Sequence, residues 1–145
     1  MLTNSSKYAI RAVLYLAIHT DKLKRMGSKE VANAIKIPAP FLAKILQKLV
    51  KAKLVSSVKG PNGGFFLSKQ NNEKSMLDIV ACSEGIDLFK DCFLGLERCG
   101  DDNPCAIHHM VEPFKRIMIE GMGNKTIAEF AKETKEGKSF LFLKD

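Results

Sequence analysis

The chain has 145 residues, 46% of them hydrophobic, which is enough for one compact unit with a buried core. No apolar run reaches the roughly 20 residues that a membrane-spanning helix needs, and Lys7 and Arg11 interrupt the N-terminal segment, which argues against a signal peptide. The composition therefore favours a cytoplasmic protein without a membrane partner. In that compartment thiols stay reduced, so the four cysteines indicate metal binding or redox chemistry rather than structural disulfides.

The net charge of +7 is unevenly distributed along the chain. Residues 1–75 hold 14 Lys and Arg against 3 Asp and Glu, a net of +11, whereas residues 76–145 hold 9 against 13, a net of −4. A basic front half is typical of a protein that binds a polyanion. A solvated lysine-rich surface has the same composition, so the placement of the charges has to decide between the two.

Two helical patterns open the basic half. In the first, apolar residues within 8–17 are spaced for one buried face, and Ser5 or Ser6 is predicted as the N-cap. In the second, over residues 29–36, Ser28 is predicted as the N-cap, and the Ile-Pro-Ala-Pro segment that follows ends the helix. Both patterns predict helices that pack by one face against a common core.

The third helical pattern, over residues 40–51, is the most regular in the chain. Pro40 lies in its first turn, where no hydrogen bond is lost. Two short helices, a tight turn and a third helix with a basic outer face predict a helix-turn-helix, whose last helix enters the DNA major groove. A plain three-helix core with solvated lysines is the alternative. The buried stripe of the third helix comprises Leu42, Ile45, Leu46, Leu49 and Val50.

The next segment, LVSSVKGPNGGFFLS, predicts a β-hairpin, because apolar and polar residues alternate on both sides of a glycine-rich turn. A hairpin directly after a basic helix indicates a wing. The turn glycines permit positive φ and a close backbone approach to another molecule. A phosphate-binding loop is excluded, because no Gly-Lys-Ser/Thr ends the glycine run and a strand follows it. The residues predicted to contact DNA are Ser28, Pro40, Phe41, Lys44, Gln47, Lys48, Lys59, Gly60, Asn62, Gly63 and Gly64.

All four cysteines lie in the acidic half. Residues 75–84 form a short helical pattern, in which Cys82 is predicted as a small buried apolar residue. A loop-like stretch, residues 87–103, ends at the Asn103-Pro104 pair, which predicts a helix start and places the last cysteine where the helix dipole favours a thiolate. Two groups from a loop and two from a helix start can converge. This candidate ligand set is Cys92, Cys99, Cys105 and His108, with His109 as the neighbouring alternative.

The spacing of this set leaves the bound group open. Structural zinc sites usually show paired CxxC knuckles, which gaps of six and five residues between the three cysteines do not match. A mixed Cys/His set with wide gaps suits an iron–sulfur cluster, with zinc and free redox thiols as alternatives. The acidic residues near the cysteines are interpreted as loop charges: Glu97, Asp101 and Asp102. The sequence shows no nucleophile–base pair of the kind that would indicate an enzyme.

The apolar stripe that follows Pro104 is longer than a small wing domain needs, and Gly121–Asn124 ends it. A second copy of the chain is the predicted partner, because a symmetric dimer presents two recognition helices to a palindromic operator. Packing only within its own domain is the alternative. Thr126 and Glu129 predict a capping box for a last short helix. The stripe comprises Met110, Phe114, Ile117, Met118 and Met122.

These pieces resemble the Rrf2 family of bacterial winged-helix regulators over nearly the whole chain. The resemblance rests on LTNSSKYAIRAVLYLA, on the block from SKEVANAIKIPAPFLAKILQKL to GPNGGFFLS, on the cysteine segment, and on TIAEF near the end. It implies a winged helix with a long dimerisation helix. Members with three cysteines in this segment hold an iron–sulfur cluster and respond to cluster supply, redox state or nitric oxide.

On this resemblance, the three thiolate ligands are Cys92, Cys99 and Cys105, and His108 is the fourth ligand, as in the IscR type, so that a 2Fe–2S cluster is favoured over 4Fe–4S. In the NsrR type, an acidic residue of the first helix is the fourth ligand, and Lys7 cannot take that role. The CymR type lacks the cysteines and works through protein partners. The chain departs from the IscR type in a first cysteine gap one residue longer, in Lys59 where the family often has Arg, and in the extra Cys82.

The resulting hypothesis is a homodimeric, sequence-specific transcription regulator, a repressor whose DNA affinity is controlled by an iron–sulfur cluster. The alternative is a zinc-stabilised or thiol-switched winged-helix module that acts through protein contacts. The predicted fold is mainly α with a small β-hairpin. Residues 1–75 form the winged helix-turn-helix domain, 76–103 a short helix and the cysteine loop, and 104–145 the dimerisation helix with a C-terminal helix and tail.

Overall fold

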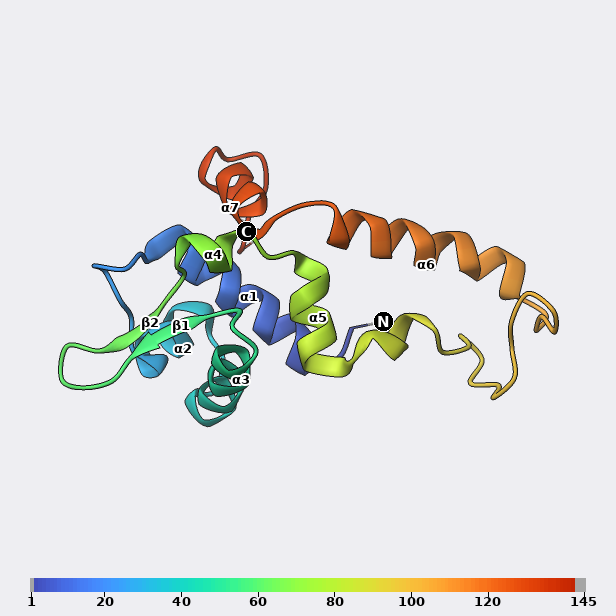
Figure 1. The fold of residues 1–145 in the computed structure, drawn as a ribbon, viewed down its shortest axis with the longest axis horizontal. Helices are drawn as coiled ribbons and strands as arrows, with labels where there is room; N and C mark the ends of the chain where they lie inside the picture. The colour runs from blue at the N-terminus through green and yellow to red at the C-terminus, as the bar shows by residue number, and fades with distance from the viewer. Residues whose placement is uncertain (1, 143–145) are drawn as a thin grey trace.

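The computed structural model describes residues 2–142, which form two parts (Figure 1). The body contains α1–α5, a β-hairpin and α7. The arm, residues 85–124, extends to one side of the body. The elements in chain order are α1 (Asn4–His19), α2 (Ser28–Ile35), α3 (Ala39–Lys51), β1 (Ser56–Val58), β2 (Gly64–Phe66), α4 (Lys69–Asn72), α5 (Met76–Glu84), the 3-10 helix η1 (Ile86–Phe89), α6 (His108–Gly123) and α7 (Ile127–Lys135).

The first helix, α1, is the central element of the body, and α2, α3, α5 and α7 all pack against it. Its N-cap is Thr3, whose hydroxyl accepts the Ser6 N–H at 3.4 Å. The predicted cap at Ser5 or Ser6 was therefore wrong, and Ser6 lies fully buried within the helix. Fully buried side chains line the helix at the predicted spacing: Ala9, Ala12, Val13 and Leu16.

Helices α2 and α3 form the predicted helix-turn-helix. Between them Lys36 adopts a left-handed conformation with φ of 55°, and Pro38 is the N-cap of α3. The predicted cap of α2 was wrong by one residue: Gly27 is the N-cap, Ser28 is the first helical residue, and no side chain caps this end. The buried stripe of α3 is confirmed at Leu42, Leu46 and Leu49, with Ile45 and Val50 half-buried.

The wing is an antiparallel hairpin in which Ser56 lies opposite Phe66, and Val58 opposite Gly64. Met26 adds a short third edge, since its N–H donates to the Phe65 carbonyl at 3.0 Å. A Cβ atom at Gly64 would lie 2.8 Å from the Met26 carbonyl oxygen, and one at Gly63 would lie 2.0 Å from the Val58 oxygen. The hairpin itself therefore requires these two glycines, which the sequence analysis assigned to contact with another molecule.

A short helix, α4, follows the wing and was not predicted. Its Asn71 is hydrogen-bonded both to the wing and to the segment after α3. Ser68 caps this helix by a reciprocal bond with Asn71. The Asn71 side chain is buried and accepts from the Ser56 hydroxyl at 2.6 Å, while its amide nitrogen donates to the Lys53 carbonyl at 2.9 Å. One buried amide thus joins the wing, α4 and the segment that follows α3.

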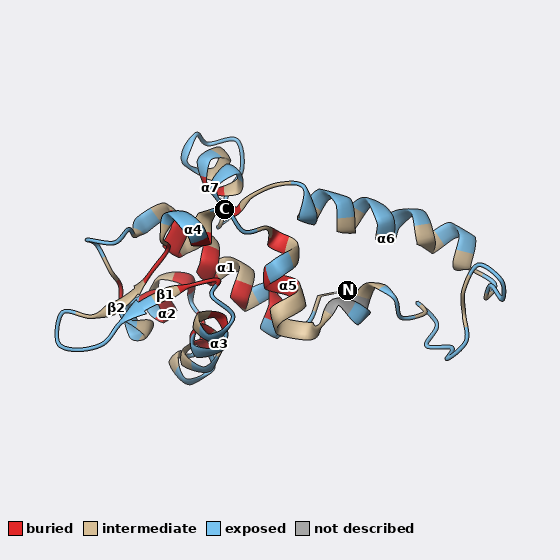
Figure 2. Ribbon diagram, viewed as in Figure 1, coloured by how far each residue is buried: buried red, intermediate tan, exposed pale blue. Residues whose placement is uncertain are grey.

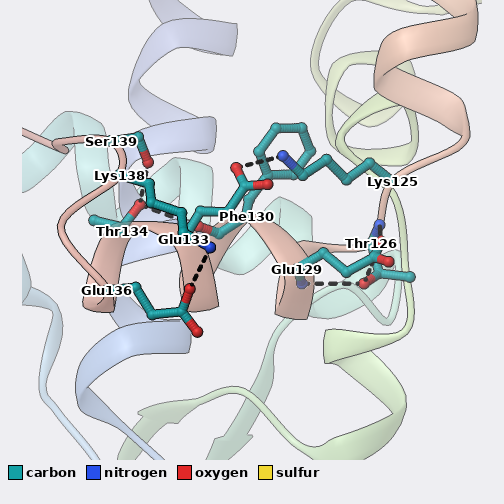
Figure 3. A network of polar contacts seen from close by, with 9 residues as sticks. All are labelled: Lys125, Thr126, Glu129, Phe130, Glu133, Thr134, Glu136, Lys138 and Ser139. Carbon is teal, nitrogen blue, oxygen red and sulfur yellow. Dashed lines mark hydrogen bonds and ion pairs between the residues drawn. The ribbon is translucent and has the colours of Figure 1, made fainter.

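The C-terminal helix α7 returns the chain to the body (Figure 3). Thr126 and Glu129 form the predicted capping box, and the Ile127 N–H donates to the Lys74 carbonyl at 2.8 Å. The Lys125 ammonium lies 4.2 Å from the centre of the Phe130 ring and pairs with Glu133. This helix belongs to the body rather than to a separate tail. Of the C-terminal tail, residues 143–145 lie outside the described part of the chain.

The arm is built differently from the body (Figure 2). Its long helix α6 has no buried residue, and Met110, Phe114 and Ile117 are 62%, 67% and 67% exposed. The predicted helix start at Asn103-Pro104 was wrong, because α6 begins at His108, and η1 occupies part of the predicted loop. None of the helices in residues 2–142 combines the length and apolar character needed to cross a membrane.

Candidate metal centre and DNA interface

Three cysteines converge at the tip of the arm. The Sγ atoms of Cys92, Cys99 and Cys105 all lie within 4.8 Å of one another, and those of Cys92 and Cys105 are 3.7 Å apart. A disulfide would bring two sulfurs to about 2.05 Å, so these are free thiols. The structure thus brings together three groups from a segment whose first and last cysteines are 13 residues apart in sequence.

Two tight turns produce this convergence. In the first, Gly95, with φ of +74°, lets its N–H donate to the Cys92 carbonyl at 2.9 Å. In the second, Gly100 and Asn103 exchange backbone hydrogen bonds of 3.3 and 3.0 Å. The chain then reverses so that the Cys105 N–H donates to Cys99 Sγ at 3.4 Å. The helix N-terminus expected for this cysteine is instead taken by His108.

His108 lies beside the thiols, and its side chain is 10% exposed. Its Nδ1 is 3.3 Å from Cys99 Sγ, and its Nε2 is 3.0 Å from Asp101 Oδ1. Asp101 was predicted as a loop charge only. In the structure its carboxylate lies within hydrogen-bond distance of the His108 ring. The neighbouring His109 is exposed and lines a surface groove with Asp101, Pro113 and Arg116.

The groups around the cysteines shift the pKa values of two of the thiols. The backbone N–H groups of Leu96 and Leu94, together with the neighbouring thiols, lower the pKa of Cys92 to about 7. The N–H of Cys105 also favours the thiolate of Cys99, but burial and the adjacent thiols outweigh it and raise the pKa of Cys99. Cys92 therefore forms a thiolate more readily than Cys99 does, and the thiolate is the form that binds a metal ion or cluster.

The predicted DNA-contacting residues occupy two elements of the body. On α3, Pro40, Phe41 and Lys44 are exposed, and Phe41 is 63% exposed despite its apolar ring. An open groove of about 500 Å³ runs between α3 and the wing. The predicted residues that line it are Gln47, Lys59 and Gly64, while Gly60 and Asn62 are exposed at the wing turn and Gly63 is half-buried there.

Two predicted residues remain, one on α3 and one on α2. The Lys48 ammonium donates to the Ser83 carbonyl at the end of α5, at 3.3 Å. Ser28 is half-buried at the start of α2. Neither lines the groove. Cys82 is half-buried against the core, with its Sγ 3.9 Å from the Lys48 carbonyl, which agrees with its prediction as a small apolar residue only in part.

Arg25, which was not predicted as a functional residue, braces the wing. Its Nη1 donates to the Asn62 carbonyl and its Nε to the Lys22 carbonyl, both at 3.2 Å. Its guanidinium also lies 5.9 Å from the centre of the Phe66 ring. The only signal was a basic residue in the loop before α2, and nothing in the sequence placed that loop beside the hairpin.

Comparisons with known proteins agree with this architecture. Residues 2–133 match the Rrf2 family, described as iron-dependent transcriptional regulators. A protein of Aquifex aeolicus assigned as an HTH-type transcriptional regulator is 38% identical over 131 residues, which cover 89% of this chain and 90% of that protein. The HTH-type transcriptional regulator IscR of Sodalis glossinidius is 29% identical over 129 residues, 88% of this chain and 76% of the relative.

The fold agrees as well. The structure of CymR, the global cysteine regulator of B. subtilis, superposes with a TM-score of 0.74 at 19% identity and covers 92% of this chain and 98% of that one. The relatives are transcription regulators rather than enzymes, which confirms the expected class. With a family match that spans residues 2–133, this chain belongs to the Rrf2 family of transcription regulators, built on a DNA-binding winged helix.

Proposed function

We propose that this regulator is a homodimeric repressor whose affinity for a palindromic operator is set by an iron–sulfur cluster at the tip of the arm. The observation that carries the proposal is the convergence of three thiol sulfurs within 4.8 Å beside an imidazole nitrogen. The likeness to an IscR supports a 2Fe–2S cluster, with 4Fe–4S as the other nuclearity. The proposed ligands are Cys92, Cys99, Cys105 and His108.

The donor set fits such a group chemically. Thiolate sulfur is the usual protein ligand of iron–sulfur clusters, and replacement of one thiolate by imidazole tends to raise the reduction potential. When bound, the cluster would supply one-electron redox chemistry and sensitivity to oxidants. The chain's own part is to hold the ligands on two tight turns and the first residue of α6, where the three cysteines are half-buried.

The exposed stripe on α6 supports the homodimer. Met110, Phe114 and Ile117 are each more than 60% exposed and lie on one side of a 16-residue helix with no buried residue. Large apolar side chains grouped in this way usually mark an interface. A second copy that packs its own α6 along this stripe would cover it and would place two α3 helices in two-fold symmetry for paired half-sites.

Contacts from the cluster loop reach both α6 and the body. The Lys115 ammonium donates to the Asp91 carbonyl at 2.5 Å, which ties the loop to α6. Phe93, next to the first cysteine, lines an apolar cavity of about 110 Å³ together with Phe114 and Leu2, the latter just before α1. We propose that a change at the cysteines reaches α6 through Lys115 and reaches the body through the residues that line this cavity. Such couplings are typically ~1–3 kcal/mol, or about 5–150-fold in affinity.

For DNA reading, we propose that α3 enters the major groove through Phe41, Lys44 and Gln47, and that the wing residues 59–64 follow the adjacent backbone or minor groove. A Lys→Ala change at a phosphate contact weakens binding across sequences and lowers the salt slope by about 1. We expect this for Lys44→Ala and Lys59→Ala. Lys135→Ala, on α7 at the opposite side of α1 from α3, is the matched control (Figure 1). Unchanged affinity of Lys44→Ala at every salt concentration would contradict this assignment of α3.

The cluster is tested by anaerobic purification followed by absorption spectroscopy and operator titration of the same sample. The wild type is expected to be brown, and loss of the cluster is expected to change operator affinity by at least about 5-fold. Cys99→Ser should lose the colour, whereas Cys82→Ala, at a cysteine of the body, should keep it. Operator affinity that does not respond to the cluster would refute the regulatory role.

A zinc-stabilised module is the second candidate, and one observation favours it. The space enclosed by the cysteines, His108 and the adjacent part of α6 is about 10 Å³, which suits a single ion more than a cluster unless the loop opens. A colourless protein with one zinc per chain after anaerobic purification would establish this candidate in place of the first.

A further inference from the structure

His108 has a different partner at each of its two ring nitrogens. Nδ1 faces the sulfurs, 3.3 Å from Cys99 Sγ, and Nε2 lies 3.0 Å from Asp101 Oδ1. We propose that Asp101 is a positioning residue, whose carboxylate accepts the Nε2–H of His108 and leaves Nδ1 as the atom that binds the metal. This inference rests on the metal centre of the proposed function, and it assigns the binding atom and the residue that selects it.

The choice of nitrogen follows from the donor inventory. A neutral imidazole carries one N–H, and an ionised carboxylate can only accept hydrogen bonds. With Asp101 at Nε2, the hydrogen bond forms only when that nitrogen carries the proton, so the lone pair is left on Nδ1, next to Cys99. Metal-binding histidines commonly donate their other N–H to a carboxylate in this way, which fixes the tautomer and the ring orientation.

The fold also holds Asp101 in place. It occupies a turn closed by the two backbone hydrogen bonds between Gly100 and Asn103, and the Asn103 side chain donates to the Arg98 carbonyl at 3.0 Å. The Asp101 side chain is 85% exposed, so water competes for its oxygens. The closed turn reduces that competition, because the backbone needs no further ordering to reach His108.

The inference also distinguishes the two adjacent histidines. The His109 ring meets that of His108 edge-on, with centroids 5.2 Å apart, and it is exposed toward the groove with Arg116. Asp101 is hydrogen-bonded to His108. Only a histidine that faces the sulfurs with one nitrogen and the carboxylate with the other meets the requirement, and in residues 2–142 that histidine is His108.

The chain offers a matched control in Asp102, an exposed carboxylate next to Asp101 for which the structure shows no bond to either histidine. Asp101→Ala removes the acceptor from Nε2, and Asp102→Ala removes the same charge one residue away. Asp101→Asn keeps an acceptor oxygen and should fall between the wild type and Asp101→Ala. A purely electrostatic role of the loop would make the two alanine variants behave alike.

The tautomer is measured first, by nitrogen-15 NMR of the full-length, reduced, metal-free protein. The wild type and Asp102→Ala should show His108 protonated at Nε2, and Asp101→Ala should lose that preference. Protonation at Nδ1 in the wild type, or an unchanged tautomer in Asp101→Ala, would overturn the inference.

Cobalt(II) titration, followed by its thiolate absorption, then measures the consequence. Asp101→Ala should bind the ion about 10–100-fold more weakly than the wild type, the usual effect of losing such a partner, while Asp102→Ala should not change. Equal affinity in the two variants would refute the positioning role. A wild type that binds cobalt but never a cluster would refute the proposed function alone, whereas a cluster-bearing wild type with equal variants would refute only this inference.

Discussion

The body and the arm each contain a helix of 16 residues, and the two helices are buried to opposite degrees. Six of the 16 residues of α1 are buried, at the three- and four-residue spacing of one helix face, whereas α6 has no buried residue. The body therefore draws its stability from its own core, since burial of apolar surface is the main favourable term in folding. The arm buries little apolar surface within one chain, which is consistent with the second copy and the bound group that we propose for it.

This difference suits DNA binding by the body and the sensing role that we propose for the arm. A DNA-reading unit has to hold α3 and the wing at a constant separation, and the buried Asn71 and the bracing Arg25 contribute to this. A sensing unit has to change state with a small input of free energy, and segments with few buried contacts open at low cost. The placement of the cysteines on the arm is consistent with that requirement.

The largest expected effect tests the core of the body. Leu16→Ala removes a fully buried side chain of α1 and should lower the free energy of unfolding by about 2–5 kcal/mol. Leu94→Ala makes the same chemical change on the arm, where the side chain is 53% exposed, and should cost less than about 0.5 kcal/mol. Urea unfolding measures both. Equal losses would show that the arm has a core of its own.

The next effect concerns the stripe on α6. Ile117→Glu places a charge on an apolar surface that we propose a second copy covers, and it should raise the dimer dissociation constant by about 10–100-fold, or ~1.4–2.8 kcal/mol. Leu23→Glu, at a body residue that is 92% exposed, is the control and should leave dimerisation unchanged. Analytical ultracentrifugation distinguishes them, and a monomeric wild type would contradict the prediction outright.

Alanine at two glycines should have opposite effects in the two parts. Gly63→Ala would place a Cβ atom 2.0 Å from the Val58 carbonyl, so the wing must distort, at a cost of about 1–3 kcal/mol. Gly121→Ala lies within α6 with no atom within 4 Å of the added Cβ, and it should stabilise that helix by about 0.5–1 kcal/mol. The melting temperature of each variant, compared with that of the wild type, shows whether the substitution stabilises or destabilises the protein. Destabilisation by Gly121→Ala would indicate that α6 is closely packed after all.

The smallest effect lies at Glu84, where the body joins the arm. Burial would raise its pKa, but hydroxyl and amide groups at the start of α1, including those of Thr3, outweigh burial and lower it. A carboxylate with a lowered folded pKa stabilises above its unfolded pKa, and this contribution is lost as pH falls through the folded value. Glu84→Gln should therefore destabilise the protein at pH 7 and become neutral in strong acid. Unfolding curves between neutral and acidic pH test the sign.

Much of the body could be predicted because its signals are local. The stripe of α3, the glycine-rich hairpin turn and the capping box at Thr126 each depend on residues a few positions apart. The errors at Ser6 and Ser28 are shifts of a cap by a few residues, where several hydroxyl-bearing or small residues compete. The Asn103-Pro104 signal failed for a different reason: Asn103 closes a turn that brings Cys105 back toward Cys99, and this turn takes the place of the expected helix start.

By itself, the sequence determined the class of fold, the basic face of α3 and the candidate ligands, because periodicity, charge and side-chain chemistry are properties of neighbouring residues. Only the tertiary structure decided how these parts meet. In the tertiary structure, Arg25 is hydrogen-bonded to the wing, Lys48 to the end of α5, and Asp101 to His108. Those contacts depend on backbone turns whose combined geometry positions side chains to within hydrogen-bond distance, and the residue spacing in a linear chain does not contain that information.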